Sequence, residues 1–215
     1  MVLWNIRKAR NGWIFRAKEP KPADLLIIAQ EQQISFSRGK PHRHERTLNR
    51  QKHAYWTTPE GQDLKLNVDA AWIPGEFLCS VAGVLRDSDG RTLDGFAATG
   101  RVSSASEAEA EAILHGLKHM HELQLLHVGN SGSRTGKCFI ESDCSPVVEM
   151  VMGRAETPWN LKEIVKQCRN GLNQNKNITV IHCPRQANAA ADWIARNHRL
   201  RTLPGNWMLS PPFLS

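Results

Sequence analysis

The stretch LKLNVDAAW, residues 64–72, constrains the fold most, because it alternates strictly and carries an acid at its centre. One side of the two-residue period consists of Leu64, Leu66, Val68, Ala70 and Trp72, and the other of Lys65, Asn67, Asp69 and Ala71. Such alternation is typical of a β-strand with one buried face. Aspartate is depleted in strands, and burying a carboxylate without a partner is costly. The pattern therefore predicts a strand in which Asp69 serves a function.

Two more strands are predicted directly after this one. Residues 78–86 (LCSVAGVLR) and 91–100 are separated by Asp87-Ser88-Asp89-Gly90. This segment is a strong hairpin signal, because glycine readily adopts the positive φ that such a turn needs. We therefore expect the domain to begin with a three-stranded antiparallel meander.

Helices and strands alternate in the rest of the chain. We expect a long helix over 104–123, a strand over 137–142, a short helix from Ser145, a helix over 158–173, a strand over 178–183 and a last helix over 188–198. The resulting order, βββαβααβα, indicates an α/β domain.

Length and charge divide the chain of 215 residues into three parts. Residues 1–60 hold 12 Lys and Arg against 5 Asp and Glu, whereas residues 61–215 hold 16 Lys and Arg against 16 Asp and Glu. We expect a basic, partly helical or flexible extension over 1–55, a domain over 56–200, and a Pro-rich tail over 201–215 that packs by Trp207 and Phe213. The basic extension suggests a polyanionic partner, although a soluble leader without a partner would have the same composition.

The lack of a secretory or membrane-spanning segment and the scattered cysteines favour an intracellular protein, in the nucleus or the cytoplasm. The longest apolar run, Leu25–Ala29, is too short to span a membrane, and the N-terminus lacks the layout of a signal peptide. The basic linker Ser37–His53 is a candidate nuclear address. The five cysteines form no CxxC pair, so we expect reduced, buried thiols. We expect a monomer without membrane association, and the sequence suggests no protein partner.

The long helix contains several glutamates, and periodicity selects one of them. Glu109 shares its stripe with residues that are apolar or small, namely Ala105, Ala112, Ile113, Gly116 and Met120. Glu111 lies instead on a polar stripe typical of a solvated face. We therefore expect Glu109 to point toward the sheet, with a glutamate at the rim of the helix as the alternative. Ser106 and Glu109 also have the spacing of a capping box.

Two aspartates complete the set of candidate acids. Asp143 follows the strand over 137–142, where α/β proteins gather ligands, and Asp192 lies one turn into the last helix. For each of them the alternative is an acid that simply compensates the dipole at a helix N-terminus. Several carboxylates converging on one point are what hard divalent cations require for phosphoryl transfer.

Four segments resemble a known family in the same order and with ordinary spacing. LKLNVDAAW, ASEAEAEAILHGL, CFIESDCSPVVEM and ITVIHCPRQANAAADWIA are similar to the ribonuclease H domains of plant non-LTR retroelements and of plant proteins derived from them. The similarity covers about residues 56–197. It implies a ribonuclease H-like fold with a five-stranded mixed sheet, flanked by helices and preceded in this chain by the basic extension.

The resemblance also implies a catalytic site. By motif, Asp69, Glu109, Asp143 and Asp192 match the four metal-binding acids of the family, and His182 matches a loop histidine that assists proton transfer and product release. A strand-end histidine with a local hydrogen bond is the alternative for His182. This chain has Ala70 where the family usually has glycine after the first aspartate, and it lacks the basic helical protrusion with which some members grip their substrate.

The function implied is hydrolysis of the RNA strand of an RNA–DNA hybrid by an endonuclease that leaves 5′-phosphate ends. The expected cofactor is a pair of Mg²⁺ ions about 3.5–4 Å apart, with Mn²⁺ as a possible substitute. The alternatives are a non-catalytic nucleic-acid-binding remnant of the same fold and another nuclease of that fold, such as a resolvase or an exonuclease.

Overall fold

The computed structural model describes residues 55–127 and 136–208. All the described residues belong to one unit of the chain, His53–Ser215. The predicted extension over 1–55, except for its last residue, and the predicted packing of Phe213 lie outside the described residues. Within the described ranges, no helix has the length and apolar character needed to cross a membrane.

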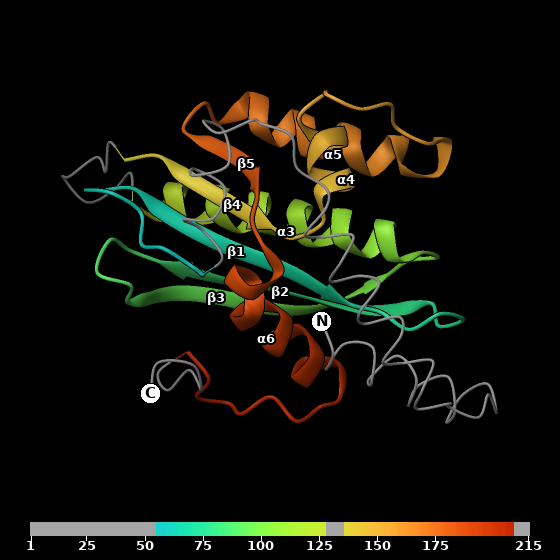
Figure 1. Cartoon of the computed structure of the whole chain (residues 1–215), viewed down its shortest axis with the longest axis horizontal. Coiled ribbons are helices and arrows are strands. Elements are labelled where there is room, and N and C mark those ends of the chain that lie inside the picture. Colours follow the sequence, from blue (N-terminus) through green and yellow to red (C-terminus); the bar gives the residue numbers. More distant parts are fainter. Residues whose placement is uncertain (1–54, 128–135, 209–215) are drawn as a thin grey trace, which may run out of the picture. The chain divides into compact units, whose positions relative to one another are not determined.

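A mixed five-stranded sheet forms the centre of the unit (Figure 1). Its strands are β1 (Leu64–Ala71), β2 (Leu78–Arg86), β3 (Thr92–Arg101), β4 (Cys138–Ser142) and β5 (Ile178–His182). In the order β3-β2-β1-β4-β5, the first three pair antiparallel, whereas β4 pairs parallel with both β1 and β5. The predicted meander is confirmed, and so is its turn, in which Gly90 has a φ of +79°.

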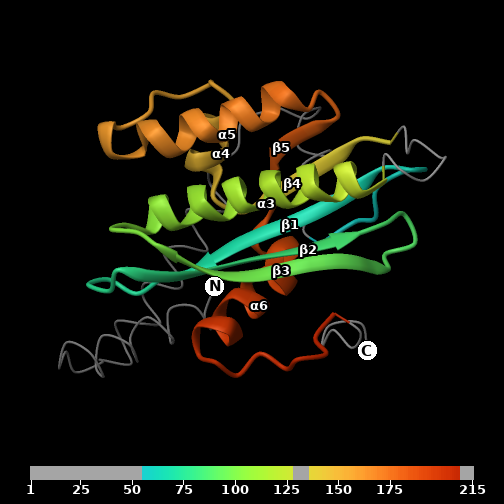
Figure 2. The same cartoon turned by 180° about the vertical axis from the view of Figure 1, so that it is seen from behind.

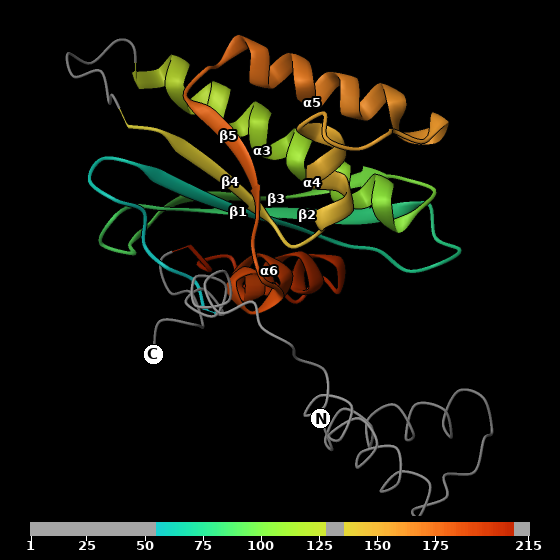
Figure 3. The same ribbon diagram turned by 45° about the horizontal axis from the view of Figure 1, so that its top comes forward.

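Helices cover both faces of the sheet (Figures 2 and 3). One face carries α3 (Ala105–His127), α4 (Ser145–Val151) and α5 (Lys162–Gln174), and the other carries α6 (Ala189–Arg199). Two short 3-10 turns, η2 (Trp159–Leu161) and η3 (Arg185–Asn188), precede α5 and α6. The predicted order of strands and α-helices is therefore confirmed, while the two 3-10 turns were not predicted.

The two faces of β1 differ as the alternation predicted. Leu66 and Val68 are fully buried in the core beneath α3. Gly116 of α3 lies so close to β1 that a Cβ on it would be 3.0 Å from Val68 Cγ1. Asn67 and Asp69, on the other side of the strand, face the start of α6 instead, where the N-cap residue Asn188 contacts both of them. The strand thus presents Asp69 on its polar side.

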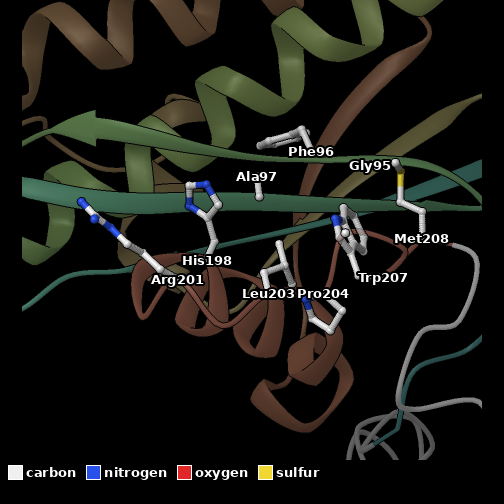
Figure 4. A pocket seen from close by; sticks show the side chains of 10 residues that line it. Gly95, Phe96, Ala97, His198, Arg201, Leu203, Pro204, Trp207 and Met208 are labelled. Atoms are coloured by element: carbon white, nitrogen blue, oxygen red, sulfur yellow. The ribbon is translucent and has the colours of Figure 1, made fainter.

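Packed structure continues past residue 200, beyond the predicted end of the domain. Trp207 is only 7% exposed and packs in a small apolar cluster between β2 and α6. Together with Leu203 and Pro204 it lines an open pocket of about 470 Å³ beside Phe96 and His198 (Figure 4). This pocket shares no residue with the group of acids described below. The predicted packing of Trp207 is confirmed.

The cysteines are isolated thiols, as the sequence predicted. All five are free, four of them are buried, and Cys144 is half-buried. Burial raises the pKa of Cys138, Cys168 and Cys183 to about 12 in each case. These thiols are therefore protonated at neutral pH and serve as small core residues.

Candidate metal centre

Three of the four predicted acids meet at one end of the central strand. One carboxylate oxygen from each of Asp69, Glu109 and Asp143 lies within 4.8 Å of the others. These residues come from β1, from α3 and from the end of β4, so the group brings together parts of the chain up to 74 positions apart. Asp69 is buried, and the other two acids are half-buried.

The sheet itself creates the opening in which these acids meet. The parallel pairing of β1 with β4 ends at Asn67 and Glu141. Asp69 and Asp143 each lie two residues beyond this last pair, past the point where the two strands stop pairing. Ligand sites of α/β sheets form at such a point, where strand neighbours diverge beyond their carboxyl ends.

The start of α3 differs from the prediction in a way that leaves Glu109 free. Ser106 and Glu109 have the spacing of a capping box, but the cap forms earlier in the chain, with Ser104 and Glu107. The amide of Glu107 instead donates to Ser104 Oγ at 3.2 Å, while Glu107 Oε2 accepts from the amide of Ser103 at 2.7 Å. Because Glu107 serves as the capping acid, the carboxylate of Glu109 is available to the site.

Burial and mutual repulsion raise the pKa values of Asp69 and Glu109. Burial raises the pKa of Asp69 to about 9, and the negative charge of Glu109 adds to this. Burial likewise raises the pKa of Glu109 to about 8, with a further contribution from Asp143. Removal from water and crowding of like charges both favour the neutral acid. A bound cation would reverse this balance by stabilising the ionised forms.

The residues present fit a hard divalent cation. Glu109 Oε2 is buried and has no hydrogen-bond partner among the described residues. A buried carboxylate oxygen is rarely left unpaired, and here it lies in a group of three acids that repel one another. Oxygen ligands from several carboxylates are the set that Mg²⁺ and Mn²⁺ prefer. We therefore regard this group as a candidate metal centre.

The fourth predicted acid, Asp192, lies near this group but outside the three that converge. It stands in the first turn of α6, and its Oδ1 is paired with Arg196 Nη2 at 2.8 Å. Its charge contributes to the raised pKa values of Asp69 and Glu109. Asp192 is thus close enough to act on the site electrostatically while it is bound to an arginine one turn away.

His182 lies on the strand next to the one that leads to Asp143. It is the last residue of β5, pairs in register with Ser142 immediately before Asp143, and is exposed to solvent. It follows that His182 is accessible from solvent close to the candidate metal centre.

Sequence reasoning missed the polar residues that support Asp69. Asn188 Nδ2 donates to Asp69 Oδ1 at 3.2 Å and to the carbonyl of Val68 at 2.9 Å. Asn67 in turn donates to Asn188 Oδ1. Two signals were available: Asn67 shares the polar side of the first strand with Asp69, and Asn188 has the family's spacing to His182 and Asp192. Neither signal reveals that the two asparagines, 121 positions apart, are hydrogen-bonded.

Comparisons with known proteins point in the same direction. A family described as reverse transcriptase-like matches residues 67–198. An Arabidopsis thaliana protein named "Putative ribonuclease H protein" is 27% identical over 140 residues, which are 65% of this chain and 21% of that protein. The chain thus spans about a fifth of the length of this curated relative.

Solved structures share the fold at low sequence identity. RNase H1 of the archaeon Halobacterium salinarum aligns with a TM-score of 0.55 at 18% identity, covering 65% of this chain and 98% of that one. LC11-RNase H1, isolated from compost, gives 0.55 at 19% identity, covering 67% of this chain and 100% of that one. This likeness confirms the fold class that the sequence resemblance implied.

Proposed function

Because the chain belongs to the reverse transcriptase-like family, we propose that it is a metal-dependent endonuclease that hydrolyses the RNA strand of RNA–DNA hybrids. The observation that carries the proposal is the convergence of Asp69, Glu109 and Asp143 within 4.8 Å at the end of the central strand. The similarity to a plant protein is consistent with the retroelement origin that the sequence suggested.

In this proposal the acids hold the cofactor, a pair of Mg²⁺ ions for which Mn²⁺ can substitute. Asp69, Glu109 and Asp143 supply oxygens from one side, and Asp192 joins them by leaving its ion pair with Arg196. Bound there, the metal would activate a water molecule and stabilise the oxygen that leaves. The pair with Arg196 keeps the charge of Asp192 compensated until then.

His182 has the role of moving protons at the edge of the site. Its ring is exposed at the end of β5, next to the start of the segment that carries Asp143. Histidine exchanges protons near neutral pH. We therefore propose that His182 assists proton transfer and release of the product.

The substrate class follows from the fold and from the chemistry of the site. LC11-RNase H1, whose complex with an RNA/DNA hybrid aligns with a TM-score of 0.53 at 20% identity over 62% of this chain and 94% of that one, binds such a hybrid. Recognition would use the 2′-hydroxyl groups across the shallow minor groove, with little reading of bases. The excess of basic residues in 1–60 would add salt-dependent affinity.

A panel of end-labelled substrates tests this proposal. The purified chain is incubated with an RNA–DNA hybrid, duplex DNA, duplex RNA and single-stranded RNA of one sequence, with Mg²⁺ or with EDTA. We expect cleavage of the RNA strand of the hybrid alone, only with metal, and with 5′-phosphate products. Binding of the hybrid without cleavage at any Mg²⁺ or Mn²⁺ concentration would instead identify a non-catalytic nucleic-acid-binding domain, and preferred cleavage of duplex DNA would identify a different nuclease of this fold.

A further inference from the structure

A chain of buried hydrogen bonds leads away from the candidate metal centre. Asn188 Nδ2 donates to Asp69 Oδ1 at 3.2 Å, and Asn188 Oδ1 accepts from Asn67 Nδ2 at 3.2 Å. Asn67 Nδ2 also donates to Glu141 Oε2 at 2.9 Å. Both asparagines are 0% exposed. Two fully buried amides in series next to a candidate metal ligand require an explanation.

Arg86 and Glu141, at the end of these hydrogen bonds that is farther from Asp69, fix which amide atoms donate and which accept. Arg86 Nη2 donates to Asn67 Oδ1 at 3.3 Å, and a guanidinium can only donate. An ionised Glu141 can only accept, so the amide of Asn67 cannot be reversed. Asn67 therefore offers an N–H to Asn188, which must accept with its oxygen and turn its own N–H groups outward. As a result, Asn188 presents a donor to Asp69 Oδ1.

The charged groups that set this pattern of donors and acceptors are themselves held in place. Lys65 Nζ forms an ion pair with Glu141 Oε1 at 3.1 Å, and both side chains are largely buried. The ring of Trp56 lies over the guanidinium of Arg86, with 4.0 Å from Cζ to the ring centroid. Lys65 thus pairs with the buried anion Glu141, while the aromatic ring of Trp56 covers the second cation, Arg86.

We propose that Asn67 and Asn188 are positioning residues for the reaction proposed above. The hydrogen bonds from Arg86 through Asn67 and Asn188 to Asp69, here called the relay, hold Oδ1 of Asp69 and leave its other oxygen to the metal. This inference rests on the proposed function. Groups that orient metal ligands in this way typically change metal affinity or activity about 10–100-fold when they are removed. The relay acts through Asp69 and touches neither substrate nor metal.

Three substitutions separate positioning from mere support of the fold. Asn188→Leu removes the donor to Asp69 and keeps a buried side chain of similar length. Asn67→Thr interrupts the relay one step further away with a residue that suits a strand. The matched control is Ser80→Ala, because Ser80 is also buried and also ties the sheet to α6, through 2.7 Å between Ser80 Oγ and His198 Nδ1. Ser80 has no hydrogen bond to the relay.

The readouts are the affinity for Mn²⁺ alone, from titration calorimetry, and the thermal unfolding midpoint of the full chain. We expect Asn188→Leu to weaken Mn²⁺ binding about 10–100-fold, Asn67→Thr to weaken it less, and Ser80→Ala to leave it unchanged. The two asparagine substitutions should be non-additive in the double variant, because they interrupt one relay. Substrate cleavage should fall through a higher Mn²⁺ requirement, which added metal restores.

The outcome that overturns the proposal is wild-type Mn²⁺ affinity in folded Asn188→Leu and Asn67→Thr, even if both unfold at lower temperature. Additive effects of the two substitutions would also overturn it. These results differ from a failure of the proposed function, in which the wild-type chain binds Mn²⁺ but leaves the hybrid intact. A wild-type chain that binds no Mn²⁺ would contradict both.

Discussion

Asp69 and Glu109 are acids whose environment opposes their ionisation. Their pKa values of about 9 and about 8 exceed the ordinary values because burial disfavours the charged forms and because neighbouring acids repel them. The folded chain without metal therefore binds more protons than the unfolded chain between the ordinary and the raised pKa. By linkage, its stability falls as the pH rises through that interval.

This linkage gives the first prediction. Without metal, the unfolding midpoint of the wild-type chain should decline from about pH 4 to about pH 9 more steeply than that of Asp69→Asn, which has no carboxyl group to ionise at this position. The measurement is thermal unfolding across this range in EDTA. Added Mg²⁺ should oppose the decline in the wild type, because it binds the ionised acids. Equal pH dependence in the two chains would contradict the raised pKa of Asp69.

Much of the site could be predicted residue by residue. Asp69 was found because a central acid is unusual in a strand, and Glu109 because it lies on the apolar stripe of its helix. The ion pair of Asp192 with Arg196 was not foreseen, since it depends on the choice between a distant metal and a partner one turn away. Asn188 was missed because its partners are on β1, more than 100 positions earlier.

At the level of elements, the order of strands and helices followed from periodicity, while the ends depended on local hydrogen bonds. The long helix begins close to the predicted residue, but its capping acid is Glu107. Both glutamates fit a Ser-x-x-Glu pattern, with Ser104 or with Ser106, and the sequence alone does not rank the two. Contacts of the folded chain determine which glutamate caps the helix, because the carboxylate of Glu109 lies in the candidate metal centre.

The observed cap gives the second prediction. Ser104→Ala should lower the free energy of unfolding by about 1 kcal/mol, because the amide of Glu107 loses its acceptor. Ser106→Ala is the matched control, and it should change stability by less than about 0.5 kcal/mol as an ordinary exposed substitution. Urea unfolding measures both. A larger loss of stability in Ser106→Ala than in Ser104→Ala would indicate that Ser106, and not Ser104, caps the helix.

At the scale of the whole molecule, the end of the domain is set by packing and not by composition. The sequence predicted a Pro-rich tail after residue 200 that packs by Trp207, and Trp207 does join the cluster between β2 and α6. A single large aromatic side chain can bury enough surface to fix an irregular segment. The sequence did not show which strand and helix Trp207 packs between, because composition does not locate the partners of a single tryptophan.

Trp207 gives the third prediction. Trp207→Ala should destabilise the chain by roughly 3–5 kcal/mol, the usual range for removing a buried aromatic side chain. Trp159→Ala is the matched control, because Trp159 is 84% exposed and should cost little. Chemical unfolding of the wild type, Trp207→Ala and Trp159→Ala measures these differences in stability. Similar stability of all three would show that residues 201–208 do not support the fold.

The uneven charge of the chain gives the fourth prediction. A chain of residues 55–215 lacks all the excess positive charge and should bind the hybrid more weakly, with a smaller dependence on salt concentration. Its cleavage rate at saturating hybrid should be unchanged, because the candidate metal centre lies within the unit His53–Ser215. Fluorescence anisotropy at several salt concentrations measures the affinity. An identical salt dependence of the two chains would exclude a role of the extension in binding.

The most direct test is the rate of RNA-strand cleavage, under single-turnover conditions and across a Mg²⁺ titration, in the wild type, in Asp69→Asn and in Glu111→Gln. Glu111 is the control acid, because it lies on the same helix as Glu109 and pairs with His115 at 3.5 Å. The converging carboxylates predict Mg²⁺-dependent cleavage by the wild type and by Glu111→Gln, and none by Asp69→Asn. Cleavage that is undiminished in Asp69→Asn would contradict the account.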